Sequence, residues 1–192
     1  MKEESMMKTI MFAIAILLVS VWAMRFGPGS QPRPDPAAEQ TAMIEHGKNL
    51  VTKMDCNGCH TPFVNGKPDM TRMLSGHPEA IKITEIPKPI SERWPVSVSD
   101  TNTAWAGPWG VSFTANLTPD EHSGIGSWSE QQFVDAIKKG KHMGANARNL
   151  LPPMPWEAYA AGSSDYDLKS MYAYLRSIPP IVNLVPQHPL EP

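Results

Sequence analysis

Cys56-Asn57-Gly58-Cys59-His60 is the stretch that decides how this chain is interpreted, and it contains both cysteines of the sequence. If the stretch is helical, positions i, i+3 and i+4 lie on one face, so the two sulfurs and the imidazole point at the same object. The spacing is that of a covalent haem attachment site. Two thiols can bond the vinyl groups of a porphyrin while the adjacent histidine ligates the iron. We therefore predict one haem c, attached through Cys56 and Cys59, with His60 as an axial ligand.

Three other interpretations of the motif stay open at this stage. A structural zinc site needs four ligands, and no second paired half-motif follows in the sequence. A thioredoxin-like thiol pair belongs at a strand-to-helix junction of a βαβ unit, an alternation that the flanking sequence does not show. A structural disulfide is the simplest alternative, but it gives no reason for the histidine after the second cysteine. Haem is favoured over all three.

Composition limits the remaining possibilities. The chain has 192 residues and a net charge of -2, so nothing in its charge indicates a nucleic-acid partner. Its 20 prolines and 13 glycines predict long irregular connections around few regular elements. A single C-x-x-C-H motif predicts a single haem.

The N-terminal segment 1–26 carries an apolar run from Thr9 to Met24 behind two lysines. The run is longer than many signal-peptide cores and shorter than the roughly 20 residues that span a bilayer comfortably. We predict a retained membrane anchor with its positive end inside, and we keep cleavage as a signal peptide as the alternative. Residues 27–36 contain four prolines and predict an extended linker. Either fate of the anchor places the rest of the chain outside the cytoplasm.

Two long helices are predicted around the motif. Asp35 is a suitable N-cap, with Pro36 at the first helical position, for a helix that leads toward the motif. Gly47 lies on the apolar face of this helix, and the close approach of another helix is the expected reason. The last helix begins at a capping box of Ser164 and Asp167 and ends at Ile178-Pro179-Pro180, and we expect it to be the partner of Gly47.

Two further helices are expected between these. Ser129 with Gln132 three residues later predicts a helix over 130–139 that Gly140 ends. A short helix is predicted over 157–161.

The segment 61–115 shows little periodicity and is a long loop by any standard. Its aromatic side chains argue for packing rather than disorder: Trp94, Trp105, Trp109 and Phe113. We expect the segment to cover one side of the haem pocket, with at most a short hairpin.

The stretch Leu151-Pro-Pro-Met154-Pro155 supplies the second predicted ligand. Prolines on both sides restrict the backbone, so the thioether of Met154 is presented at low entropic cost. Sulfur opposite histidine completes a six-coordinate haem iron. Methionines more often serve core packing, and Met143, Met70 and Met73 are the rival ligands.

Four stretches together resemble one family, the monohaem class I-like bacterial cytochromes c of membrane-associated dehydrogenase and respiratory subunits. The resemblance covers roughly residues 40–185, and the stretches that carry it are the C-x-x-C-H motif, Asn116-Leu117-Thr118-Pro119-Asp120 with the following Gly124-Ile125-Gly126, the Met154 loop, and Tyr174 to Pro180. It implies an all-α cytochrome c-like fold, thioethers at Cys56 and Cys59, and axial bonds from His60 and Met154. The long insertion after the haem motif departs from the family's minimal pattern.

The expected organisation is an anchor or signal at 1–26, a linker at 27–36, a cytochrome c domain at 37–185 and an extended tail at 186–192. The resemblance implies outer-sphere electron transfer on the periplasmic side of a bacterial inner membrane, as a tethered carrier or as a subunit of an oxidoreductase complex, with no catalytic activity of its own. Signal cleavage would instead leave a soluble periplasmic protein. The His60 N–H that does not face iron should donate to a backbone carbonyl.

Two alternative functions remain. The first is a haem enzyme or a gas or redox sensor with a labile sixth ligand, in which His77, His122 or His142 acts as a distal acid-base group. The second is a mainly structural subunit whose haem is incidental.

Overall fold

The computed structural model describes residues 35–88, 91–143 and 148–186. The predicted membrane segment 1–26, nearly all of the linker 27–36 and the tail beyond residue 186 lie outside these ranges. Within the ranges, no helix combines the length and apolarity needed to cross a membrane. The chain divides into two compact units, residues 1–38 and 39–192, and every element named below lies in the second except the first turn of α2.

The described residues form five α-helices and two small antiparallel sheets, so the prediction of an all-α fold is wrong. The helices are α2 (Pro36–Lys53), α3 (Cys56–His60), α4 (Glu130–Lys139), α5 (Trp156–Gly162) and α6 (Asp165–Ser177). The strands are β1 (Phe63–Val64), β2 (Lys67–Pro68), β3 (Ser97–Val98), β4 (Ala104–Gly107) and β5 (Gly110–Phe113), and a 3₁₀ turn covers Met70–Arg72. All of the strands lie in the segment that was expected to be mainly irregular.

The predicted helices form where their caps indicate. Asp35 accepts the backbone N–H of Ala37 at the start of α2. Ser129 and Ser164 each make a complete capping box, at the start of α4 and of α6, and Gly140 ends α4 in the left-handed conformation. These local hydrogen bonds satisfy backbone donors that the first turn of a helix leaves unpaired, which is why the boundaries could be predicted.

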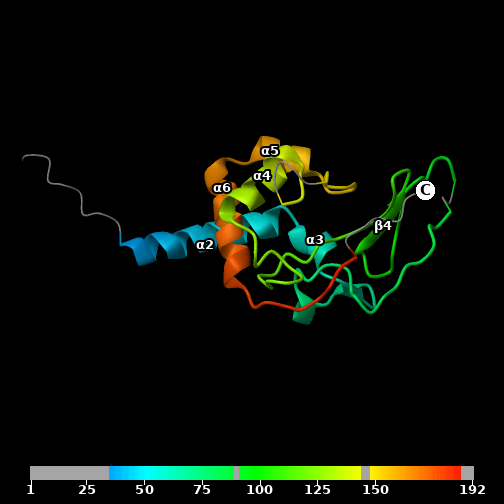
Figure 1. The fold of residues 1–192 in the computed structure, drawn as a ribbon, viewed down its shortest axis with the longest axis horizontal. Helices are drawn as coiled ribbons and strands as arrows, with labels where there is room; N and C mark the ends of the chain where they lie inside the picture. The colour runs from blue at the N-terminus through cyan, green and yellow to red at the C-terminus, as the bar shows by residue number, and fades with distance from the viewer. Residues whose placement is uncertain (1–34, 89–90, 144–147, 187–192) are drawn as a thin grey trace, which may run out of the picture. The chain divides into compact units, whose positions relative to one another are not determined.

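Helices α2 and α6 cross at Gly47, as predicted (Figure 1). A Cβ atom at this position would lie 1.8 Å from the backbone oxygen of Ser170, so only glycine permits the contact. Helix α4 packs against both α5 and α6. The buried core between these elements consists mainly of side chains from α4 and α6, completed by Val51, Leu74 and Ile125.

The larger sheet has the strand order β3-β4-β5. Its hairpin pairs Gly107 with Gly110, which leaves Pro108-Trp109 as a two-residue turn. A Cβ atom on Gly107 would meet the ring of Trp109 at 2.5 Å, so the glycine allows the indole to fold back over the turn. Strands of two to four residues give too few alternations to be recognised by periodicity, which is the physical reason that the sequence predicts at most a short hairpin where the structure has two sheets.

The chain just after β5 is hydrogen-bonded to the chain that follows α6. The side chain of Asn116 accepts the backbone N–H of Thr118 at 2.9 Å and donates to the carbonyl of Ile181 at 2.8 Å. Beyond α6, the buried amide of Asn183 donates to the carbonyls of Ser75 and His77. The chain after α6 therefore lies against the segment that follows α3.

Candidate functional site

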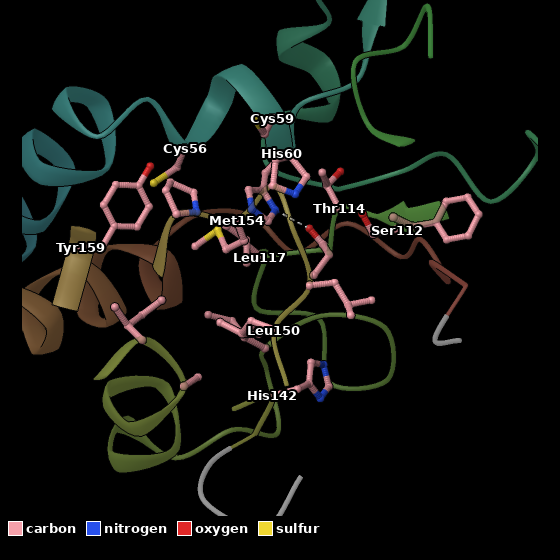
Figure 2. Close-up of a pocket in the computed structure, with 18 of the residues that line it drawn as sticks. Cys56, Cys59, His60, Ser112, Thr114, Leu117, His142, Leu150, Met154 and Tyr159 are labelled. Carbon is pink, nitrogen blue, oxygen red and sulfur yellow. Dashed lines mark hydrogen bonds between the residues drawn. The ribbon is translucent and has the colours of Figure 1, made fainter. Parts of the chain in front are cut away.

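The short helix α3 presents the three residues of the central motif to one cavity (Figure 2). It begins after Asp55, whose backbone is left-handed with φ 53°, and it contains Cys56, Cys59 and His60 on one face. A Cβ atom at Gly58 would lie 2.3 Å from a carboxylate oxygen of Asp55, so the glycine makes room for that side chain. The expected convergence of two sulfurs and one imidazole is present.

His60 is buried, and its ring is fixed by a hydrogen bond from Nδ1 to the carbonyl of Ala115 at 2.8 Å. A carbonyl can only accept, so Nδ1 carries the proton and Nε2 keeps its lone pair. Burial lowers the pKa of His60 below its ordinary value, partly opposed by the bond to Ala115. A neutral imidazole with Nε2 free is the form that binds a metal ion.

The two cysteines form no disulfide with each other, and their protein surroundings disfavour the thiolate. Burial, and then the negative charge of Asp55, raise the pKa of Cys56 to about 12. The same two causes raise the pKa of Cys59. Thiol-disulfide exchange sites instead lower the pKa of the attacking cysteine, so the redox-pair interpretation loses support. No group of three or more His, Cys, Asp or Glu residues that could hold a metal ion occurs in the described ranges.

The loop with Met154 lines the same cavity (Figure 2). Its backbone turns back on itself, with the N–H of Met154 donating to the carbonyl of Leu151 at 3.2 Å, and the peptide bond between Pro152 and Pro153 is cis. A second contact comes from the larger sheet, where the Ser112 hydroxyl donates to the Pro152 carbonyl at 2.6 Å.

The cavity excludes the three rival methionines and includes one that the sequence analysis did not consider. Met143 and Met70 are exposed, and neither they nor Met73 line the cavity. Met171 does line it, from α6, where it is 4% exposed within the helical core. A methionine at a helix-packing position gave no signal of its own in the sequence. Two thioethers therefore face the cavity in the described part of the chain.

The remaining walls are mainly apolar and aromatic, with Asp55 and Arg148 as charged residues, and this lining suits a large flat ligand. Two aromatic side chains come from the inserted segment, and three come from the helical part: Trp105 and Phe113, then Trp128, Phe133 and Tyr159. Trp94 points elsewhere and is 67% exposed. The donor set and these walls fit a porphyrin, since the two thiols can bond its edge while imidazole and thioether groups are available to its iron.

Of the three histidines considered as acid-base groups, only His142 lines the cavity. Its ring meets Trp128 edge-on, with centroids 5.1 Å apart, and burial and the charge of Arg148 lower its pKa. His77 is buried outside the cavity, between the hydroxyl of Thr103 and the carbonyl of Ile81. His122 is exposed.

Comparison with known proteins identifies one family. The sequence profile of the family described as Cytochrome c matches residues 44–179. The fructose dehydrogenase cytochrome subunit of Gluconobacter japonicus is 30% identical over 147 residues, which cover 76% of this chain and 24% of that protein. The gluconate 2-dehydrogenase cytochrome c subunit of Pantoea cypripedii is 28% identical over 138 residues, covering 69% of this chain and 22% of that protein.

A third relative is the cytochrome c subunit of the quinone-type alcohol dehydrogenase of Gluconobacter oxydans. It is 27% identical over 156 residues, which cover 81% of this chain and 24% of the relative. This chain thus spans about a quarter of the length of each of the three relatives.

Proposed function

This chain belongs to the cytochrome c family and carries one haem c attached through Cys56 and Cys59, and from that premise we propose how it transfers electrons. The haem, when bound, supplies an iron that alternates between the ferric and ferrous states and so accepts and donates one electron at a time. In this proposal His60 and Met154 would be the two side chains that hold its iron. The two residues line one cavity, and that single observation carries the assignment.

The surroundings of His60 support its part. The Ala115 carbonyl holds the ring in the tautomer that exposes Nε2, and burial keeps the imidazole neutral. The hydrogen bond that Nδ1 donates also fixes the ring orientation and increases the basicity of Nε2 as a ligand. His60 would therefore bind strongly and without reorganisation on electron transfer.

Met154 is preferred to Met171 because of where each lies. Met154 is in a proline-rich loop outside the helices and lines the cavity, and it packs against the helical core only as a partly buried side chain. Met171 is buried in α6 beside the crossing with α2, so its thioether already serves the helical core. A thioether is a soft ligand that favours the ferrous ion, and the apolar walls disfavour added positive charge, so both would raise the reduction potential.

If His60 and Met154 both hold the iron, the site would have no place for a substrate at the metal. The chain would then act by outer-sphere electron transfer and have no catalytic activity of its own. We propose that it does so with a bacterial oxidoreductase complex, since its relatives are named as cytochrome subunits of dehydrogenases. The apolar run from Thr9 to Met24 supports an anchored position on the periplasmic side of the membrane.

Carbon monoxide tests whether the sixth position is closed. The reduced wild-type protein at neutral pH should bind carbon monoxide slowly and incompletely, because Met154 must leave first. Met154→Leu should bind it fast and completely, while Met171→Leu, which removes the other thioether of the cavity, should behave like the wild type. Rapid, complete binding by the wild type would instead favour a sensor or peroxide-reacting enzyme, with His142 as the acid-base group within reach.

Purification in mild detergent tests the assignment to a complex. The full chain should be recovered from membranes together with a dehydrogenase that reduces its haem when the substrate of that enzyme is added. A control chain that lacks residues 1–30 should be recovered without membranes and with its haem spectrum intact. Recovery of the full chain from the soluble fraction, with no dehydrogenase, would contradict the anchored assignment.

A further inference from the structure

One strand of the inserted segment contacts both walls of the haem cavity. Strand β5 and the residues that continue it run from Gly110 to Ala115. On one side, the Ala115 carbonyl accepts the hydrogen bond that orients His60. On the other, the Ser112 hydroxyl donates to the Pro152 carbonyl, two residues before Met154. The four residues from Ser112 to Ala115 therefore link the ring of His60 to the backbone of the Met154 loop.

The neighbours of Ser112 fix the direction of its proton. The hydroxyl is buried, and the indole N–H of Trp109 donates to its oxygen at 3.3 Å. An indole N–H can only donate, so the serine oxygen accepts there and its single proton is left for another acceptor. Two carbonyls are near, Pro152 at 2.6 Å and Trp105 at 3.5 Å, and the shorter contact takes the proton.

The Met154 loop has few other hydrogen bonds to the rest of the protein. Three of its five residues are prolines, which have no N–H to donate. Its own hydrogen bonds are local: Met154 to Leu151 within the loop, and Tyr159 to Pro155 at the start of α5. In the part of the chain that the structure describes, Ser112 is the residue that donates to the loop from a separate element.

We propose that Ser112 is a positioning residue for the methionine ligand, through which the inserted sheet holds the Met154 sulfur at the iron. The proposal rests on the assignment of Met154 as the sixth ligand. Ser112 does not touch the haem iron itself in this role. It fixes the Pro152 carbonyl, and with it the part of the loop that carries the thioether, so that the sulfur does not have to be held by its own bond alone.

Imidazole added to the ferric protein is the probe, because it competes with a thioether for the sixth position. In Ser112→Ala the apparent affinity for imidazole should rise about fivefold to tenfold, the size expected from the loss of one buried hydrogen bond. In the same titration, the absorption band of the iron-thioether bond should weaken at lower imidazole concentrations in Ser112→Ala than in the wild type. Ser112→Thr keeps the hydroxyl on a strand that accepts β-branched residues, and it should restore most of the wild-type affinity.

Thr103→Val is the matched control. It removes a buried hydroxyl that directly precedes strand β4 of the same sheet, and this hydroxyl bonds His77 and Thr101 and has no hydrogen bond to the Met154 loop. The variant should unfold more easily in urea and yet bind imidazole as the wild type does. An equal rise in imidazole affinity in Thr103→Val and Ser112→Ala would overturn the proposal, because general loosening of the sheet would then be the cause.

The outcomes separate this proposal from the assignment on which it rests. If the wild type lacks the iron-thioether band, or Met154→Leu keeps it, the assignment of Met154 fails. If that band is present in the wild type and lost in Met154→Leu, but Ser112→Ala keeps wild-type imidazole affinity, the positioning role of Ser112 is wrong while Met154 remains the ligand. The same change in Ser112→Thr as in Ser112→Ala would also contradict the role of the hydroxyl.

Discussion

The helical part of this cytochrome and its inserted sheet differ in what stabilises them. The helices α2, α4 and α6 share a core of large apolar side chains, such as Phe133, Leu168 and Leu175. The sheet has a buried cluster of three small residues, Ala104, Ala106 and Val111. Small side chains bury little apolar surface, so the sheet depends far more on hydrogen bonds.

This difference matters because each part supplies one side of the haem site. Helix α3 carries the two thiols and His60, and its Cys56 packs against the helical core. The sheet contacts the Met154 loop through the hydroxyl of Ser112. Just beyond β5, the carbonyl of Ala115 accepts the hydrogen bond from the His60 ring. Changes in the helical part should therefore affect global stability most, whereas changes in the sheet should affect ligand binding and local opening.

Gly47→Ala should have the largest effect, because it attacks the helical part at its closest contact. The added Cβ would lie 1.8 Å from the backbone oxygen of Ser170. The backbone of α6 cannot move away from it without separating α6 from α2. We expect a loss of about 3 kcal/mol or more in the free energy of unfolding, measured by urea denaturation of the haem-loaded protein.

Gly162→Ala is the control for that prediction. This helical glycine ends α5, and a Cβ atom there would meet nothing within 4 Å. The substitution should leave stability unchanged or raise it by a few tenths of a kcal/mol, about what helix propensity gives near a helix end. Similar losses in the two variants would mean that the α2–α6 crossing is not the source of the effect.

Asn183→Ala should have the next largest effect, and it tests how the inserted segment is held. The buried amide donates to Ser75 and His77 at 2.7 and 2.8 Å and accepts from Glu79 at 2.9 Å. Truncation leaves these backbone groups unpaired, at about 2 kcal/mol. Hydrogen exchange should show faster opening of residues 72–79 with little change in α4 and α6. Uniform acceleration across both parts would contradict the separation of the two regions.

The smallest expected effect is a pH dependence that originates in the inserted segment. Burial lowers the pKa of His77 below its ordinary 6.5, opposed by the hydrogen bond to Ile81 and assisted by the charges of Lys82 and Arg72. The unfolded chain therefore takes up this proton at a higher pH than the folded one. Stability from His77 is complete above pH 6.5 and falls as the pH drops below that value.

His77→Gln checks this assignment, because the amide keeps a donor and an acceptor but does not titrate. Urea denaturation at pH 7.5 and at a pH about two units lower should show a smaller difference in stability for the variant than for the wild type. Equal differences in the two proteins would exclude His77 as the source.

The sequence predicted the helical part better than the sheet, for reasons visible in particular residues. Ser129 and Ser164 determine helix starts through local hydrogen bonds, and Gly140 ends α4 through its left-handed backbone. Gly47 indicates a close helix crossing by its place on an apolar helix face. The strands depend instead on pairing between residues up to nine positions apart, as Ala104 does with Phe113, and local patterns do not encode such pairing.

In the candidate site too, the residues that are neighbours in the sequence could be predicted, and the contacts between distant residues could not. The thiols and His60 were predicted because they are neighbours in one short motif, and the bond from His60 to a backbone carbonyl was expected from the chemistry of metal-bound histidine. The acceptor, Ala115, lies 55 residues away, and Ser112 lies 40 residues from Pro152. Met171 was missed because a core methionine on a helix has no distinguishing pattern, and only the folded chain places it beside the cavity.

The central claim is that Met154 closes the haem site opposite His60, and methyl NMR of the reduced protein tests it most directly. With the methyl carbons of all 12 methionines labelled, a methyl group bound next to the iron lies over the porphyrin and is shifted far upfield by its ring current. We predict one such signal, lost in Met154→Leu and kept in Met171→Leu. No upfield methyl signal in the wild type, or its loss only in Met171→Leu, would contradict the account.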